Sequence, residues 1–182
     1  MLGVILSLTF LISCCSQKQL SSRYKSPEGW VVGMESYPDA GFMIRFEYPE
    51  TIKIASTIDN CISFGIELSD SNEFEANEQD NTRQWSICLH DTVEYSSITL
   101  FNSWKSTFSN DVIVESESVE VDRMIVELRT IKSGSKMNEF RQLLYFEKFS
   151  TLFEVINKDE STLDNFKIFC KSINIEEIEN KK

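Results

Sequence analysis

The chain has 182 residues, the usual size of one domain, and its composition of 41% hydrophobic and 26% charged residues excludes a disordered polymer. Acidic residues outnumber basic ones by 29 to 18, and the net charge of −11 argues against nucleic acid as a partner and against electrostatic docking on anionic lipid. A single histidine in the whole chain leaves little scope for histidine-based acid–base or metal chemistry.

The first 13 residues, MLGVILSLTFLIS, are apolar apart from two serines and a threonine. A membrane-spanning helix needs about 20 apolar residues, so this stretch has the length of a signal-peptide core. It ends in Leu11-Ile12-Ser13-Cys14, which resembles the lipobox of bacterial lipoproteins. The resemblance implies cleavage before Cys14 and lipidation of its sulfur, and two or more acyl chains hold a protein stably on a membrane. We therefore expect an envelope lipoprotein, anchored on the periplasmic or surface side.

The resulting organisation has three parts: a signal peptide at 1–13, a polar tether at 14–29 and one globular domain at 30–178. Two alternatives remain open for the N-terminus. Cleavage could be shifted to precede Cys15, or the apolar segment could be an uncleaved tail or a buried strand.

The first predicted strand covers 42–48, where apolar residues alternate on one face and Pro49 ends the run. Two further strands are expected at 62–68 and 85–90. Between them the segment 69–84 is acidic and shows no apolar period, which predicts a loop.

The pattern then changes to a helix at 98–109, because Phe101, Trp104 and Phe108 share one helical side. Short turns separate the next strands, so they must be antiparallel and form a meander. These four strands are expected at 112–121, 124–131, 139–148 and 152–157.

A second helix is expected at 161–173, with Ser161 and Asp164 placed as a capping pair. Its apolar stripe comprises Leu163, Phe166, Phe169 or Cys170, and Ile173. The charged tail 176–182 is expected to be frayed.

This order predicts an α+β domain in which an antiparallel meander carries amphipathic helices. The strand FMIRFEYPE at 42–50, the helix and hairpin after it, the Tyr145-Phe146 strand and the final helix together resemble PsbP/Mog1-like proteins over 30–178. The resemblance implies an α/β/α sandwich. It implies no particular activity, because one fold serves many functions.

Of two cysteines near the acidic loop, Cys61 directly precedes the strand predicted before it, and Cys88 lies in the strand predicted after it. If these strands form a hairpin, Cys61 and Cys88 face each other, close enough for a disulfide. An exported protein meets an oxidising compartment, so we expect this bond to form. The alternative is two reduced, buried cysteines. Cys170, on the last helix, is expected in the core.

Candidate chemistry is sparse. His90 is interpreted as a surface residue at a strand end beside Asp91, and no G-x-S-x-G nucleophile motif accompanies it. The acidic loop could supply oxygen ligands for Ca²⁺, but a solvated charge run is the preferred interpretation. Core packing is expected for the aromatic residues that could otherwise line a pocket: Trp30, Trp85, Trp104, Tyr145 and Phe146. No cofactor or metal is expected.

These observations favour a non-enzymatic binding or accessory module, with the membrane as one partner through the lipid anchor and a basic protein as another. A narrower version is an immunity-type lipoprotein that covers a basic toxin. The alternative class is an enzyme acting on envelope polymers through two carboxyl groups.

Overall fold

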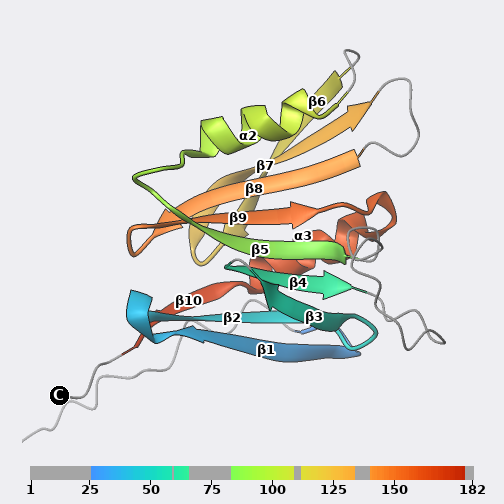
Figure 1. Ribbon diagram of the computed structural model, residues 1–182. Helices are drawn as coiled ribbons and strands as arrows, with labels where there is room; N and C mark the ends of the chain where they lie inside the picture. Colours follow the sequence, from blue (N-terminus) through green and yellow to red (C-terminus); the bar gives the residue numbers. More distant parts are fainter. Residues whose placement is uncertain (1–25, 59, 66–82, 109–111, 134–139, 179–182) are drawn as a thin grey trace, which may run out of the picture.

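The computed structural model describes residues 26–58, 60–65, 83–108, 112–133 and 140–178 (Figure 1). Strands dominate these residues, and two short 3-10 turns and two α-helices accompany them. The strands are β1 (Trp30–Tyr37), β2 (Phe42–Pro49), β3 (Lys53–Ile58), β4 (Cys61–Gly65), β5 (Arg83–Asp91), β6 (Val112–Val121), β7 (Met124–Ser133), β8 (Phe140–Lys148), β9 (Thr151–Asn157) and β10 (Asn174–Glu177). The helical elements are η1 (Pro38–Ala40), α2 (Ser97–Ser106), η2 (Glu160–Thr162) and α3 (Leu163–Ser172).

The described strands form two antiparallel sheets. The larger has seven strands in the order β3-β4-β5-β9-β8-β7-β6, and the smaller has the order β1-β2-β10. Strands β6, β7, β8 and β9 are neighbours in chain order, so the predicted four-strand meander is confirmed. With two helices packed on the sheets, the α+β class is confirmed as well.

The main core lies between the two sheets and includes α3, which packs against β2, β6 and β9. Figure 1 shows α3 behind the large sheet and α2 in front of it. The face of β2 that points inward carries Phe42, Ile44 and Phe46, as the alternation predicted. The predicted stripe of α3 is also confirmed, because Phe166, Phe169, Cys170 and Ile173 are all buried.

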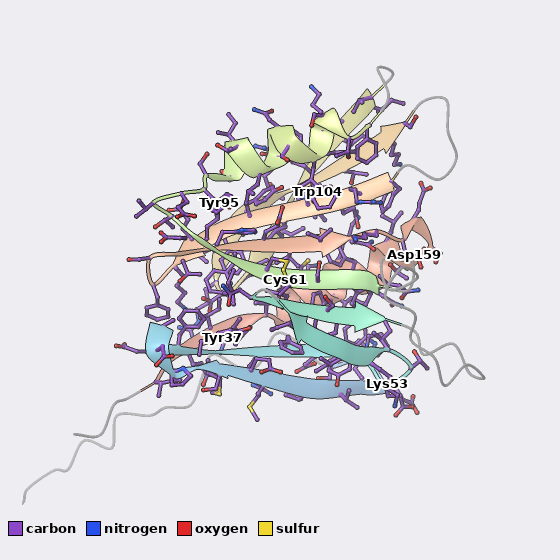
Figure 2. All side chains as sticks on the ribbon, in the orientation of Figure 1. Tyr37, Lys53, Cys61, Tyr95, Trp104 and Asp159 are labelled. Atoms are coloured by element: carbon purple, nitrogen blue, oxygen red, sulfur yellow. A yellow bond between two sulfur atoms is a disulfide. The ribbon has the colours of Figure 1, made fainter. Side chains whose placement is uncertain are left out.

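A smaller core lies on the opposite face of the large sheet, under α2. Phe101, Trp104 and Phe108 pack there against buried sheet residues. The predicted helix side is confirmed for Phe101 and Trp104, whereas α2 ends at Ser106 and Phe108 follows it. No residue of α2 is fully buried, whereas α3 has three buried residues: Phe166, Phe169 and Cys170. In Figure 2 the Trp104 side chain points from α2 towards the strands, while other side chains of the helix point away from the sheet. Helix α2 is therefore held by a few specific contacts.

Three strands were not predicted: β1, β3 and β10. Strand β10 begins directly after α3 and pairs with β2, so Glu176 and Glu177 lie in a sheet and the prediction of a frayed tail is wrong for them. The predicted capping pair is also wrong. Asp159 caps the 3-10 turn that precedes α3 by accepting a hydrogen bond from the Ser161 amide, and Thr162 precedes the helix without a side-chain cap.

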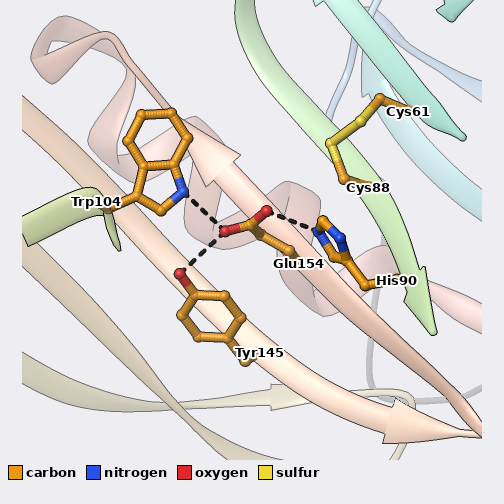
Figure 3. The surroundings of a disulfide bond; sticks show 6 residues. All are labelled: Cys61, Cys88, His90, Trp104, Tyr145 and Glu154. Atoms are coloured by element: carbon orange, nitrogen blue, oxygen red, sulfur yellow. Dashed lines mark hydrogen bonds and ion pairs between the residues drawn. A yellow bond between two sulfur atoms is a disulfide. The ribbon is translucent and has the colours of Figure 1, made fainter. Parts of the chain in front are cut away.

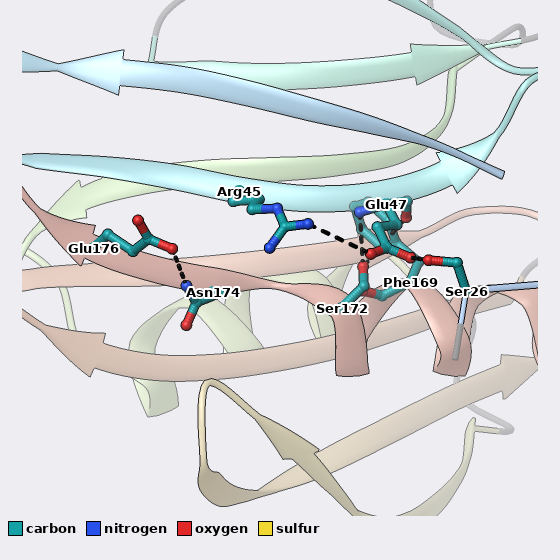
Figure 4. Close-up of polar contacts among 7 residues, drawn as sticks. All are labelled: Ser26, Arg45, Glu47, Phe169, Ser172, Asn174 and Glu176. Atoms are coloured by element: carbon teal, nitrogen blue, oxygen red, sulfur yellow. Dashed lines mark hydrogen bonds and ion pairs between the residues drawn. The ribbon is translucent and has the colours of Figure 1, made fainter. Parts of the chain in front are cut away.

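The end of α3 is fixed to the small sheet by one serine (Figure 4). The Ser172 hydroxyl accepts a hydrogen bond from the Glu47 amide at 2.8 Å and lies 2.7 Å from the Phe169 carbonyl oxygen. Ser26, which precedes β1, donates a hydrogen bond to the Glu47 carboxylate, and the Arg45 guanidinium of β2 lies 4.0 Å from the same carboxylate. Helix and small sheet are thus joined by polar contacts as well as by the core.

Candidate functional site

The most unusual side chain of the described residues is a carboxylate at the centre of the large sheet. Glu154 lies on β9 and is only 4% exposed. Among the described residues the Asp122 side chain is as deeply covered, but its carboxylate is paired with Lys148, whereas Glu154 has no lysine or arginine partner in an ion pair. Its neighbours across the strands are Cys88 on β5 and Tyr145 on β8. Side chains alternate between faces along a strand, so Glu154 points to the side that α2 covers, whereas Phe153 and Val155 point into the main core.

Three side chains from three elements direct hydrogen bonds to this carboxylate (Figure 3). The Trp104 indole N–H of α2 donates to Oε1 at 2.8 Å, and the Tyr145 hydroxyl donates to the same oxygen at 3.0 Å. Nε2 of His90 lies 2.9 Å from Oε2 and donates to it when that nitrogen carries the proton. Both carboxylate oxygens are therefore occupied by groups of the protein itself.

Strand periodicity explains why these residues meet. His90 follows Cys88 by two positions on β5, so both point to the same face, and Glu154 is paired with Cys88. Tyr145 reaches the carboxylate because it stands directly opposite on β8. Trp104 comes from the aromatic side of α2, which closes the group from above. The His90 ring is covered by Tyr95, whose ring centre lies 5.2 Å away, although the His90 side chain remains 20% exposed.

The electrostatics of the group keep the hydroxyl of Tyr145 protonated. Burial raises the pKa of Tyr145 far above its ordinary value, and the neighbouring Glu154 charge and hydrogen bond raise it further. The Arg129 charge acts in the opposite direction but is outweighed. Tyr145 therefore remains a neutral hydroxyl, able to donate to Glu154, at all physiological pH values.

Two arginines complete the attachment of α2. The Arg129 guanidinium lies 4.6 Å from the centre of the Phe101 ring, and that of Arg141 lies 5.5 Å from the centre of the Trp104 ring. Such cation–π contacts add to the packing of both aromatic residues. The arrangement around Glu154 thus ties a helix that has no fully buried residue to three central strands.

The disulfide lies at the edge of this group. Cys61 of β4 and Cys88 of β5 stand opposite each other in the register expected from the sequence, and the structure joins their sulfurs across a separation of 27 residues. Cys88 belongs to the smaller core under α2, and Cys61 packs against it. The bond fixes β4 to β5 beside the position where Glu154 meets β5.

The structure locates some of the remaining predicted site residues and leaves others outside its described ranges. Cys14 lies outside the described residues, and so does the predicted acidic loop 69–84 except for Arg83 and Gln84, which begin β5 and not a loop. His90 is not the simple surface residue expected, because it contacts Glu154, and its neighbour Asp91 instead caps a turn by accepting from the Val93 amide. Cys170 is fully buried, and burial raises the pKa of its thiol. It is a core residue, as expected.

The aromatic residues considered for a pocket divide between the two cores. Trp30, Trp85 and Phe146 belong to the main core, whereas Trp104 and Tyr145 pack with the smaller core and bond Glu154. Core packing is therefore confirmed. Sequence reasoning missed the two hydrogen bonds that the Trp104 indole N–H and the Tyr145 hydroxyl donate to Glu154. The available signal was a charged residue inside an apolar strand, Phe153-Glu154-Val155.

A second buried polar group fixes the approach to α3. The Asn157 amide donates to Gln142 at 3.1 Å and its oxygen accepts from the Asp159 amide at 2.8 Å. Nearby, the Trp85 indole N–H donates to the Thr162 hydroxyl at 3.0 Å. These partners satisfy each other, as buried polar groups must, so this second group is structural.

Over the described ranges, no three residues among His, Cys, Asp and Glu come together in a way that could hold a metal ion. Nor does any helix described there combine the length and apolar character needed to cross a membrane.

A scan against models of known protein families finds no match to the chain, and a search of curated proteins finds none either. Function is therefore inferred from the contacts of the described residues and from the sequence patterns.

Proposed function

We propose that the protein is a lipid-anchored lipoprotein of the bacterial cell envelope that acts by binding a partner and not by catalysis. The observation that supports a location outside the cytoplasm is the Cys61–Cys88 disulfide. Such bonds persist in exported proteins and are rare in a reducing cytoplasm. The Leu11-Ile12-Ser13-Cys14 pattern supports the anchor. The proposal places the domain outside the cytoplasm, tethered through residues 14–29.

The non-enzymatic role is supported by the state of Glu154. A carboxylate pair that cleaves a glycosidic bond needs one group to protonate the leaving oxygen and a second at a defined separation. The oxygens of Glu154 accept hydrogen bonds from Trp104, Tyr145 and His90. Asp122, whose side chain is as deeply covered, is paired with Lys148. The Glu154 carboxylate is thus used to hold α2. The enzymatic alternative lacks a comparable supporting observation.

We further propose that the domain belongs to the PsbP/Mog1-like group. The support is the order of its elements: an entry strand ending in Tyr48-Pro49, a helix, a hairpin, the Tyr145-Phe146 strand and a final helix. The packing of α2 and α3 on opposite faces of the large sheet supports the sandwich arrangement that the group has.

The anchor is tested by the intact mass of the protein extracted from membranes of its native host, beside a Cys14→Ala variant. We expect the mass of residues 14–182 plus acyl chains in the native protein, and loss of this species in the variant. A chain that starts at Met1 and carries no lipid would contradict the proposal.

The compartment is tested on the same sample by alkylating thiols without reductant before digestion. We expect a linked peptide pair containing Cys61 and Cys88. Cys170 is an internal control, because it is buried and should react only after the protein unfolds. Alkylated Cys61 and Cys88 in the folded protein would remove the structural support for export.

A further inference from the structure

One edge of the large sheet is a long strand that is paired on one side only. β6 is the last strand of its sheet, and each of its residues is paired with β7 on one side only (Figure 1). Natural edge strands are usually short, interrupted by proline or a bulge, charged, or covered by a helix or loop, because an open edge can pair with another chain. β6 is ten residues long, has neither proline nor lysine, and keeps one register throughout. Helix α3 packs against β6 through the core that contains Val119 and Val121, and the only charged residues of the strand are three glutamates.

The turn between β6 and β7 shows which backbone groups face the open side. Asp122 and Arg123 have φ angles of 47° and 66°, as a two-residue type I′ turn requires. The residues flanking such a turn, Val121 and Met124, exchange both backbone hydrogen bonds, and the bonded pairs then alternate along the hairpin. Odd-numbered residues of β6 therefore bond to β7. The even-numbered ones direct their N–H and C=O groups outward: Val112, Val114, Ser116, Ser118 and Glu120.

No backbone group outside this hairpin accepts from or donates to these five residues within the described ranges. The open edge of β6, meaning the outward backbone groups of these residues, therefore offers a continuous row of donors and acceptors at every second position. An extended peptide can complete such a row as an additional strand.

The side chains along this edge are acidic. β6 carries Glu115, Glu117 and Glu120 and has no basic residue. Lys167 of α3 contacts Glu117 at 2.8 Å, whereas Lys132 lies 3.7 Å from Glu115 and equally far from a second carboxylate, so it is shared. The Glu115 side chain is 64% exposed. An added strand would therefore meet a surface that favours positive charge.

The same charges disfavour a second copy of the chain as the occupant. In an antiparallel pair, outward residues face outward residues, so two β6 strands would place odd-numbered residues opposite odd-numbered ones. In the registers with the longest overlap, Glu117 then faces Glu117, or Glu115 faces Glu117. Like charges directly opposite each other destabilise a strand pair.

We propose that the open edge of β6 is a strand-addition site for an extended basic segment of a partner protein. Lysine or arginine at alternate positions of this segment lies beside Glu115 and Glu117, and apolar residues cover Ile113 and Val114, which are 51% and 43% exposed. This inference rests on the proposed binding role. It specifies which surface of the domain binds, and that the partner segment is basic.

The direct test uses a blocked decapeptide of alternating threonine and lysine, with a threonine–glutamate peptide as the matched control. We expect the amides of Ser116 and Ser118 to exchange with solvent quickly in the free protein. The lysine peptide should slow them at least about tenfold, as added strand hydrogen bonds protect amides. Glu115 and Glu117 amides should be slow throughout. Binding of the lysine peptide without protection of the even-numbered amides would overturn the site.

A variant separates the edge from general charge attraction. Ser118→Pro removes one outward N–H, which an edge strand tolerates because that group is not part of the inner ladder. We expect peptide affinity to fall at least about tenfold while the native circular dichroism spectrum is retained, and Ser118→Ala to bind as the native protein does. Equal affinity of the proline variant would overturn the proposal. Glu117→Gln, which leaves every backbone group in place, should weaken binding mainly at low salt.

Failure of the site and failure of the proposed function give different results. Capture of the same envelope proteins by the native chain and Ser118→Pro would overturn the edge site but leave a binding role standing. A dimer of the native chain that Ser118→Pro abolishes would overturn the basic partner, because the second copy would then be the occupant.

Discussion

Removing one hydrogen bond to Glu154 without changing side-chain shape should lower stability by a predictable amount. Tyr145→Phe deletes only the hydroxyl that donates to Glu154 Oε1 at 3.0 Å. A hydrogen bond to a charged group contributes ~1.5–3 kcal/mol, and we expect ~1.5–2 kcal/mol because Tyr145 is only partly buried and the Trp104 indole still donates to the same oxygen. For a chain of this size, that corresponds to a fall of ~3–8 °C in Tm.

The assay is urea unfolding followed by far-ultraviolet circular dichroism, with the disulfide intact. Tyr48→Phe is the matched control, because the described residues contain no hydrogen-bond partner for its hydroxyl, and its effect should stay within ~0.5 kcal/mol. Trp104→Phe removes the second donor to the same oxygen. Because the two donors share one acceptor, the double variant should depart from additivity by at least ~0.5 kcal/mol. A Tyr145→Phe effect no larger than that of the control would refute the role of Glu154 as a stabilising tie.

Three further predictions concern the rest of the domain. Replacing Cys61 and Cys88 together by serine should cost ~3–4 kcal/mol, the chain-entropy value for the loop that their 27-residue separation closes, and an unchanged urea midpoint would contradict this. Gly33→Ala should cost ~1–3 kcal/mol, because its Cβ would lie 2.2 Å from Cε2 of the fully buried Phe46 ring, and a variant as stable as the native protein would show that the ring moves freely. Stability should fall as pH rises above 10, because burial raises the pKa of Tyr145 and, to about 12, that of Tyr37, so the unfolded chain loses these protons first. Ultraviolet absorbance titration checks this last prediction, and tyrosines that all ionise near pH 10 in the folded protein would contradict it.

Local patterns made the central part of the fold predictable. The alternation in β2 and the meander are encoded in successive residues, and the tight turn at Asp122-Arg123 allowed only antiparallel neighbours. The apolar stripe of α3 repeats at helical spacing, and its buried residues are those expected. Such signals depend on neighbours in the chain, which a sequence displays directly.

The missed elements depend on partners that are distant in sequence. β10 is short and half acidic, and it becomes a strand because Ile175 is buried opposite Ile44 of β2. β1 contains Gly33, which weakens its alternation but is required there because the Phe46 ring occupies the space above it. Neither strand has a local pattern strong enough to predict it.

The site was hidden for the same reason. Glu154, Tyr145 and Trp104 are distributed over two strands and a helix, and only the tertiary register brings their polar atoms together. The sequence does indicate that Glu154 is unusual, since a charged residue within an apolar strand needs partners when it is buried. It does not show which residues those partners are.

The Glu154 group and the open edge of β6 should act independently, and the sheet itself gives the reason. β9 and β6 are separated by β8 and β7, so three interstrand steps of ~4.8 Å place them ~14 Å apart. Changes at sites more than about 7–10 Å apart usually add. Tyr145→Phe should therefore lower stability without altering peptide protection at Ser116, and Ser118→Pro should alter peptide binding without removing the hydrogen bonds that hold α2. Coupling between the two variants would mean that α2 and β6 form one unit, and that a segment bound at the edge also acts on the helix.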